Sequence, residues 1–235
     1  MTFQSENFIE SLKNAVPYIP VCLKLIFISF ALSLIIGTVI AAIRAYKIPV
    51  LSQILSVVVT VYMGLPIMVA LVIYNLLFMT TYDQIAQILH LSKNISEVDP
   101  IIVGYIALTL STTCIASENI RGAFHAIEQV QFEAGYSIGL TKMQTLVRII
   151  LPQMVPVVIP GLINLLVGTI KGSNLVSAVG IIEIMAGALI PCARTYSYLE
   201  GYLAAAVIYW ILTIVVEQAA KQLEKHSGRF RRQIV

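Results

Sequence analysis

Long apolar runs separated by short polar stretches dominate the chain. A helix needs about 20 mostly apolar residues to cross the hydrocarbon core of a bilayer. Five runs come close to or exceed this length, at residues 21–43, 51–78, 100–117, 153–170 and 199–220. The second run is interrupted at Gly64-Leu65-Pro66. The pattern therefore predicts an all-α integral membrane protein with five transmembrane helices.

A sixth apolar stretch, at 172–192, contains Glu183 and several Gly or Pro residues. Cytoplasmic loops carry an excess of Lys and Arg. Five spans with the N-terminus outside place ten of the fifteen Lys and Arg residues in the cytoplasm, whereas the best six-span arrangement places eight inside and six outside. The charges therefore predict an outer N-terminus, a cytoplasmic C-terminus and a 172–192 segment that is partly inserted without crossing. The inner residues are Arg44, Lys47, Arg121, Lys142, Arg148, Lys221, Lys225, Arg229, Arg231 and Arg232, and the outer ones are Lys13, Lys24, Lys93, Lys171 and Arg194.

This topology divides the chain into three parts. Residues 1–20 form an extracytoplasmic or interfacial segment, 21–220 form the membrane domain, and 221–235 form a basic cytoplasmic tail that extends the last helix. The largest cytoplasmic loop is 118–152 within the membrane domain.

Composition supports the membrane assignment. Apolar residues make up 58% of the chain and charged residues 11%, with a mean hydropathy of +0.89. A soluble domain carries about 25% charged residues. The net charge of +3 and the lack of a basic stripe argue against nucleic acid as a partner. The three cysteines are isolated and predict neither a disulfide framework nor a metal site.

The loop 118–152 mixes charged residues with well-spaced apolar ones, and Gly135 and Gly139 interrupt it. Glycine commonly marks the turn between short elements. The pattern predicts two short helices joined by a glycine turn and lying at the membrane surface. An ordinary amphipathic hairpin at the interface is the alternative interpretation.

The spacing in this loop resembles a known motif. Glu133-Ala134-Gly135 is followed after three residues by Gly139, and Ile149-x-Leu151-Pro152 follows after nine more. This resembles the EAA motif of bacterial ABC importer permeases, which reads EAA, three residues, G, nine residues, I-x-L-P. Gly135 stands where the family usually has Ala, a small-for-small change. Amphipathicity alone does not dictate this spacing, so the resemblance favours the permease.

The resemblance implies that the loop docks on a separate ABC ATPase and receives force from it. The chain has no Gly-Lys dipeptide and hence no Walker A loop, so ATP and Mg²⁺ are expected in a partner ATPase dimer and no cofactor in this chain. A second permease chain, identical or paralogous, and an extracytoplasmic solute-binding protein are further expected partners. The residues expected to couple to the ATPase are Glu133, Ala134, Gly135, Gly139, Leu140, Ile149, Leu151 and Pro152.

Three further segments resemble the polar amino acid permeases within this family. Residues 118–123 resemble their A-E-I-x-R-G segment, 62–66 resemble F-R-G-T-P without the arginine, and 171–180 resemble K-D-T-S-L-x-x-x-I-G. Gly172 and the aromatic-rich region 196–210 resemble cystine-type permeases. The resemblance implies uptake of a polar amino acid, with cystine as one candidate.

Polar residues within spans are candidates for a solute path. Lys171, beside Ser173 and Asn174, could attract a substrate carboxylate, or it could snorkel toward the membrane surface or pair with Glu183 for a structural reason. Hydrogen bonding between helices is the alternative role for the other polar side chains. The candidates are Lys171, Ser173, Asn174, Asn75, Thr112 and Glu118.

An ion-coupled secondary amino acid carrier is the alternative function. It would require carboxylates within spans, and Glu183, Glu200 and Glu217 lie in or near apolar runs. A membrane enzyme has no support, because no spacing of histidines with Cys, Asp or Glu suggests a metal or catalytic site.

Overall fold

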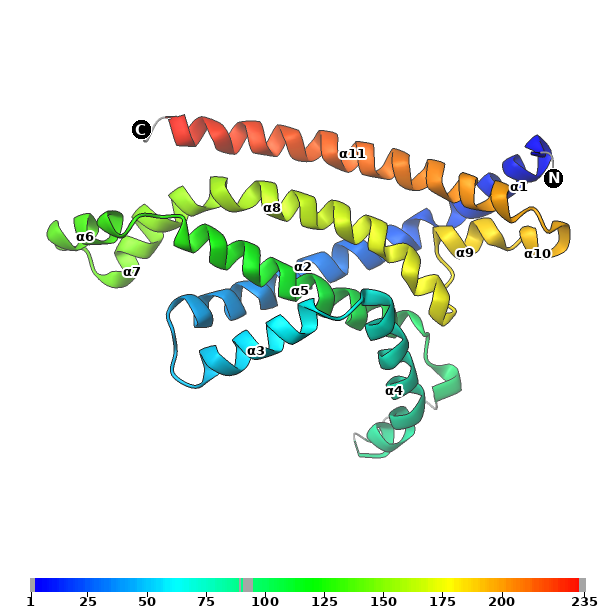
Figure 1. The fold of residues 1–235 in the computed structure, drawn as a ribbon, viewed down its shortest axis with the longest axis horizontal. Helices are drawn as coiled ribbons and strands as arrows, with labels where there is room; N and C mark the ends of the chain where they lie inside the picture. Colours follow the sequence, from blue (N-terminus) through cyan, green and yellow to red (C-terminus); the bar gives the residue numbers. More distant parts are fainter. Residues whose placement is uncertain (1–2, 89, 91–94, 233–235) are drawn as a thin grey trace.

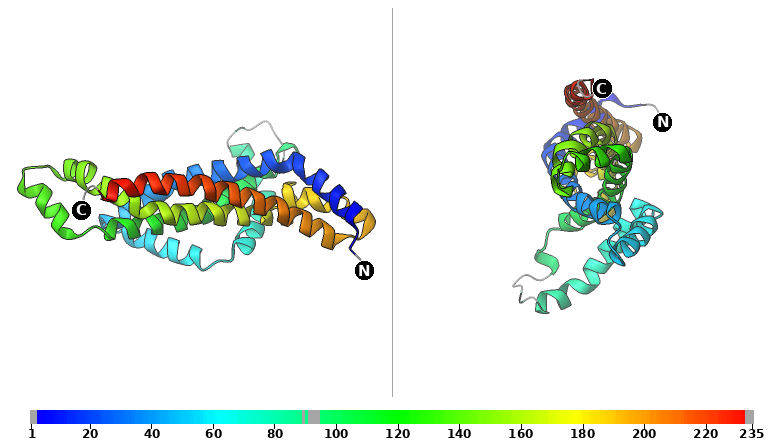
Figure 2. Two further views of the ribbon diagram at one scale, coloured as in Figure 1. Left: turned by 90° about the horizontal axis from the view of Figure 1, so that it is seen from above. Right: turned by 90° about the vertical axis from the view of Figure 1, so that its left-hand side faces the viewer.

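Four long helices run along the long axis of the molecule in this computed structural model, as Figures 1 and 2 show. They are α2 (Ile19–Ala45), α5 (Ile101–His125), α8 (Leu151–Gly172) and α11 (Tyr198–Arg232). The structure describes residues 3–88, 90 and 95–232, without the side chains of Ser96 and 223–232. Lys93, one of the predicted outer charges, lies outside the described residues.

The described residues contain five helical segments that are long and apolar enough to cross a membrane. This number agrees with the sequence-based prediction. The segments are Ser5–Ala45, Ile67–Ile88, Ile101–His125, Lys142–Val179 and Tyr198–Gln222.

The second span differs from its prediction. Instead of one helix over 51–78, the chain forms α3 (Leu51–Met63) and α4 (Ile67–Ile88). Pro66 has no N–H to donate and disfavours the helical conformation in the residue before it. The break turns α4 steeply away from the four long helices (Figure 1). The helix long enough to span is therefore α4, and α3 is a short helix packed on α2 and α5.

Small residues allow α2, α5 and α8 to approach closely. A Cβ atom built on Gly37 of α2 would lie 3.0 Å from Cβ of Ala116 on α5. Asn119 of α5 donates a hydrogen bond from Nδ2 to the carbonyl of Gly161 on α8 at 3.1 Å. Close backbone approach and interhelical hydrogen bonds are the usual means of association within a bilayer.

The segment 172–192 contains only short helical pieces. It comprises a 3₁₀ turn, η4 (Ser173–Val179), followed by α9 (Ile184–Leu189) and the beginning of α10 (Cys192–Thr195). None of these is long enough to cross a bilayer. The chain therefore folds back at this end of the bundle, as expected for a segment that does not cross.

The N-terminal residues form helix α1 (Ser5–Ala15), which a 3₁₀ turn, η1 (Val16–Tyr18), joins to α2. This helix packs along α9 and the start of α11, and Ser11 and Ala15 are fully buried. The predicted N-terminal segment is thus an integral part of this end of the bundle.

At the opposite end, the chain forms α6 (Gln129–Ser137) and α7 (Lys142–Thr145), the predicted pair of short helices. They project beyond the long helices at the end where the C-terminus lies (Figure 1). We call residues 129–145 the α6–α7 hairpin and this end of the molecule the coupling end.

Candidate functional site

The turn of the α6–α7 hairpin depends on Gly139. This residue has a φ of +82°, in the left-handed region that glycine adopts without strain. A capping box then starts α7: Gln144 N–H donates to Thr141 Oγ1 at 3.3 Å, and Thr141 N–H donates to Gln144 Oε1 at 2.9 Å. Both features are local, and they fix the angle between the two short helices.

Gly135 lies where α6 contacts α7. A Cβ atom at this position would lie 2.6 Å from Thr145 Cγ2 and 2.7 Å from Thr145 Oγ1. Thr145 is fully buried. The glycine that departs from the EAA pattern therefore leaves room for a threonine that the pattern does not mention. The sequence alone shows a small-for-small exchange, whereas the structure shows a steric requirement.

Pro152 lies in the first turn of α8. The helical conformation nevertheless continues from α7 into α8 through a π-helical turn at Leu146–Ile150. Proline cannot donate the usual backbone hydrogen bond, and π-turns commonly occur at such interruptions and at functional sites. The α6–α7 hairpin is therefore joined directly to a membrane-spanning helix.

The hairpin exposes several apolar side chains at the tip of the molecule. Ile138 is 73% exposed, beside the turn glycine. Glu133 is also exposed, and its side chain makes no hydrogen bond to another described residue. Apolar exposure of this kind marks an interaction surface. The exposed apolar residues of the hairpin are Val130, Tyr136, Ile138 and Met143, and Val147 follows in the π-turn.

A row of aromatic rings joins the hairpin to the long helices. Phe132 of α6 packs against Phe124 of α5 with ring centroids 5.7 Å apart. Phe124 in turn packs against Tyr46, directly after α2, at 5.7 Å. Movement of α6 would therefore press on two spanning helices at once.

Three charged side chains form an ion cluster beside this row. Arg44 Nη1 lies 2.5 Å from Glu118 Oε1, and Arg121 Nη2 lies 2.7 Å from Glu118 Oε2. Arg44 Nε also donates to Ser56 Oγ at 3.0 Å, so the cluster joins α2, α3 and α5. The structure thus places Glu118, a candidate for the solute path, in an ion cluster at the coupling end.

Lys171 and Asn174 line a common groove near the other end of the bundle. We call it the Lys171 groove, and it has a volume of about 470 Å³. Side chains of α11 form its opposite wall. Lys171 makes no ion pair with any described residue. The groove residues are Lys171, Asn174, Met185, Tyr202, Ala206, Tyr209, Trp210, Thr213, Ile214 and Glu217.

The other candidates for the solute path lie elsewhere. Ser173 is fully buried, with its Oγ 3.3 Å from Cys22 Sγ. Thr112 Oγ1 lies 3.4 Å from Thr169 Oγ1 between α5 and α8. Asn75 lies on α4, separate from the groove, with Nδ2 3.9 Å from the sulfur of Met79. The structure therefore brings together only Lys171 and Asn174 of the six candidates.

Sequence analysis missed the α11 side of this groove. Tyr202, Ala206, Tyr209 and Thr213 follow one another at intervals of three or four residues. Such spacing places residues on one face of a helix, and this is the signal that could have found them. Nothing in the spacing, however, indicates which helix that face meets.

The alternative interpretation of Lys171, a pair with Glu183, is wrong. The Glu183 carboxylate accepts hydrogen bonds from Met185 N–H at 2.8 Å and from the hydroxyl of Tyr209. It is fully buried, whereas Lys171 is exposed. Glu183 is therefore held by α9 and α11 and not by the lysine.

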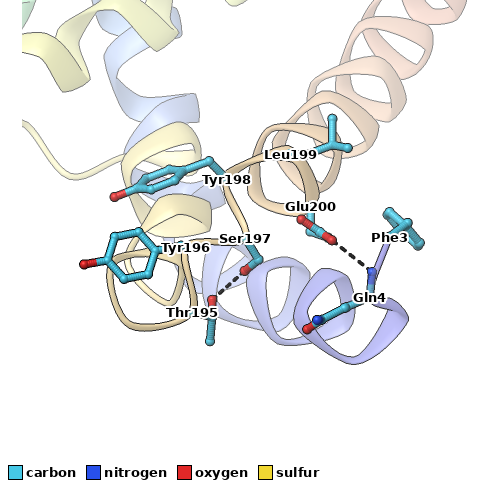
Figure 3. Close-up of a pocket in the computed structure, with 8 residues that line it drawn as sticks. All are labelled: Phe3, Gln4, Thr195, Tyr196, Ser197, Tyr198, Leu199 and Glu200. Carbon is cyan, nitrogen blue, oxygen red and sulfur yellow. Dashed lines mark hydrogen bonds between the residues drawn. The ribbon is translucent and has the colours of Figure 1, made fainter. Parts of the chain in front are cut away.

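A second hollow, of about 420 Å³, lies between the N-terminus and the turn before α11 (Figure 3). Glu200 Oε1 accepts a hydrogen bond from Gln4 N–H at 2.9 Å, and Thr195 Oγ1 lies beside Ser197 Oγ. Tyr196 and Tyr198 project from the same side of the turn in Figure 3. The carboxylate of this hollow is already engaged by a backbone amide.

Within the described part of the chain, no three His, Cys, Asp or Glu side chains gather as metal ligands would. All three cysteines are buried and free. We take the exposed hairpin at the coupling end and the Lys171 groove near the other end as the two candidate sites.

Comparisons with known proteins identify relatives of this chain among ABC transporter permease proteins. The chain is 30% identical to the probable amino-acid ABC transporter permease protein PatM of Vibrio harveyi over 92% of both chains. It is 28% identical to the L-cystine transport system permease protein TcyL of Bacillus subtilis over 93% of this chain and 89% of that one.

Solved structures show the same fold. An amino acid ABC transporter crystallised with histidines matches with a TM-score of 0.79 and 25% identity, over 96% of this chain and 100% of that one. The inward-facing MetNI methionine ABC transporter matches with a TM-score of 0.69 and 19% identity, over 91% and 95% of the two chains. These matches favour the importer over the ion-coupled carrier. Residues 12–228 also match the model of the binding-protein-dependent transport system inner membrane component, and the chain is a multi-pass membrane protein of that family.

Proposed function

We propose that this chain is the permease subunit of an ATP-driven amino acid importer, and that a separate ABC ATPase docks on its α6–α7 hairpin. The observation that carries the proposal is the exposed apolar surface around Ile138 and Met143 at the tip of the coupling end. A surface with this composition is stabilised when a partner covers it. The absence of a Gly-Lys dipeptide from the sequence supports a separate source of ATP hydrolysis, in a partner that binds ATP and Mg²⁺.

The contacts behind the hairpin support a role in transmitting force. Its continuity with α8 through the π-turn connects it to one spanning helix. The row from Phe132 through Phe124 to Tyr46 connects it to α5 and the end of α2. Closure of two ATPase subunits would move the hairpins of two permease chains together and tilt these helices. The solute would thereby gain access first to one side of the membrane and then to the other.

The Lys171 groove is the proposed solute path. An amino acid carries a carboxylate and an ammonium group, and the groove has Lys171 in one wall and Glu217 in the other. Trp210 is 67% exposed and adds an aromatic surface, which attracts cations. The relatives named for amino acid and cystine transport support this class of solute.

The remaining partners follow from the proposed path. A single chain of five spans does not readily enclose a route for a polar solute, so a second permease chain, identical or paralogous, is expected beside this one. The family description supports an extracytoplasmic binding protein that delivers the solute at the end opposite the hairpin. The charge count supports a cytoplasmic location for the hairpin and the C-terminus.

Substitution of Ile138 by aspartate tests the docking surface. Because Ile138 is exposed, Ile138→Asp should leave folding intact but place a charge in the apolar contact. We expect loss of co-purification with the co-expressed ATPase and loss of ATP-driven amino acid uptake in proteoliposomes. Val50→Asp is the matched control, because Val50 is 67% exposed in the connection between α2 and α3, outside the hairpin.

Unchanged assembly and uptake in the Ile138→Asp variant would contradict docking at this surface. Uptake by the purified chain alone, without ATPase or ATP, would contradict the importer itself. Competition among unlabelled amino acids, with L-cystine included, then identifies the transported solute.

A further inference from the structure

A buried carboxylate lies directly behind the wall of the Lys171 groove. Glu183 has no exposed surface, and its two carboxylate oxygens accept hydrogen bonds from Met185 N–H at 2.8 Å and from the Tyr209 hydroxyl. Both donors belong to residues that line the groove, although Glu183 itself does not line it. A carboxylate is costly to bury unless it is hydrogen-bonded. Removal of this carboxylate would leave the Met185 N–H and the Tyr209 hydroxyl without their common acceptor.

The bond from Met185 is a local cap of α9, whereas the bond from Tyr209 joins α9 to α11. Glu183 is the N-cap of α9, and Tyr209 lies in the middle part of α11. Met185 and Tyr209, which also share one apolar cluster, are therefore held at a fixed separation in the lining of the groove. On the side of Lys171, Ser173 is fully buried and donates to the carbonyl of Ile170 at 2.8 Å. The hydrogen bonds of Glu183 and Ser173 thus fix the backbone and side chains around Lys171, Met185 and Tyr209.

We infer that Glu183 is a positioning residue for solute binding, because it holds Met185 and Tyr209 at the distance that the solute requires. This inference rests on the proposed function of the Lys171 groove as the solute path. Glu183 does not touch the solute, and its role needs a hydrogen-bond acceptor and no charge. The role differs from that of a proton carrier, which requires a group that can ionise.

Glutamine separates the two roles. In Glu183→Gln, the amide oxygen can accept from Met185 N–H while the amide nitrogen donates to the Tyr209 oxygen, so both bonds survive. A positioning role therefore predicts a KM for uptake within about threefold of the unmodified protein. Glu183→Ala loses both bonds, and we expect its KM to rise at least about tenfold. Tyr209→Phe loses one bond, and its KM should lie between these two.

The experiment uses the complete transporter in proteoliposomes and the amino acid identified by competition. KM, maximal rate and the midpoint of thermal unfolding are measured for each variant. Glu10→Gln and Glu10→Ala are matched controls, because Glu10 forms an exposed ion pair with Arg194 at the same end and does not line the groove. A raised KM in Glu183→Ala that returns toward normal in Glu183→Gln, with the maximal rate retained, supports the inference.

Three outcomes would overturn it. Equal loss of uptake in the Gln and Ala variants would indicate a proton-carrying or charged role. A fall in thermal stability and maximal rate without a change in KM would indicate a structural role only. A normal KM in Glu183→Ala would also overturn it, provided that Lys171→Met raises the KM. If neither Lys171→Met nor Glu183→Ala changes the KM, the groove is not the solute path and the proposed path itself is wrong.

Discussion

The coupling end and the groove end of the bundle differ in how they hold their charged groups. At the coupling end, Glu118 lies between two arginines, and Arg44 contacts side chains from two other helices. At the groove end, Glu183 has only neutral donors, and Lys171 is left without an ion pair among the described residues. The charges of this cluster satisfy one another, whereas Lys171 remains available to a solute.

This difference indicates a different role for each end. Ion pairs and aromatic rings in tilted or edge-on contact that connect several helices transmit movement, because the displacement of one member displaces the others. An unpaired cation in a groove attracts an anion from outside the chain. Substitutions at the coupling end should therefore change stability and assembly, and substitutions in the groove should change the affinity for solute.

The largest expected effect follows from Glu118→Ala. This change leaves Arg44, whose side chain is 8% exposed, without its carboxylate partner and close to Arg121. Removing one member of a buried ion pair costs about 3–5 kcal/mol. The measurement is thermal unfolding of the purified protein in detergent. Glu10→Ala is the control, because its exposed pair with Arg194 contributes about 0–1 kcal/mol. An equal effect of the two substitutions would mean that the cluster does not hold α2, α3 and α5 together.

Lys171→Met should have the next largest effect, and this effect is on the KM for uptake and not on thermal stability. A hydrogen bond to a charged group contributes about 1.5–3 kcal/mol, which corresponds to a KM for uptake raised about 10- to 100-fold. Because Lys171 is exposed and unpaired, the unfolding midpoint and the co-purified ATPase should not change. Lys24→Met, at an exposed lysine of α2 outside the groove, is the control. A fall in stability without a change in KM would assign Lys171 a structural role.

Part of this fold could be predicted from the sequence, and part could not. The spans and the two short helices were predictable, because the length of apolar runs and the position of Gly139 are local signals. The division of the second span was only half predictable. The sequence Gly64-Leu65-Pro66 predicts an interruption of the helix. The direction of α4 after this interruption depends on its packing against α5 and η4.

The groove shows the limit of the sequence more clearly. Lys171 and Asn174 are neighbours in the chain, so their association follows from the motif. Their partner surface, around Tyr209 and Trp210, lies on another helix and reaches them only through tertiary packing. The same is true of Glu183. A pair with Lys171 was one alternative that the sequence left open, and the partner in the structure is Tyr209. Apolar length and motif spacing carry no information on which helical faces meet.

Gly135→Ala tests the steric requirement inside the hairpin and should have a moderate effect. The added Cβ would lie within 2.7 Å of both Thr145 Cγ2 and Thr145 Oγ1, and such overpacking costs about 1–3 kcal/mol. We expect a lower unfolding midpoint and less co-purified ATPase. Thr145→Ala removes both atoms, and Thr145 Oγ1 makes no hydrogen bond within the described structure, so the double variant should recover.

Gly122→Ala is the control for this prediction, because a Cβ there meets nothing within 4 Å on a regular helix. It should be neutral or slightly stabilising. A Cβ at position 135 also lies 3.2 Å from Ile149 Cδ1, the end of a flexible side chain. Failure of the double variant to recover would show that the space left for Thr145 is not the main reason for Gly135.

The smallest effect is expected from substitution of Gly139. It distinguishes two reasons for a glycine in the turn, which are its backbone conformation and the space it leaves for the ATPase. Gly139 has a φ of +82°, yet a Cβ atom there would meet nothing within 4 Å in this chain. If only the backbone conformation matters, Gly139→Val should cost about 1–2 kcal/mol and reduce assembly, whereas Gly139→Asn should be nearly neutral, because asparagine adopts the left-handed region more readily. ATPase co-purification and the unfolding midpoint of the isolated chain are measured for both. If Asn leaves the midpoint unchanged but still reduces co-purification, the ATPase occupies the space beside Gly139. The docking surface would then extend from Ile138 across the turn itself.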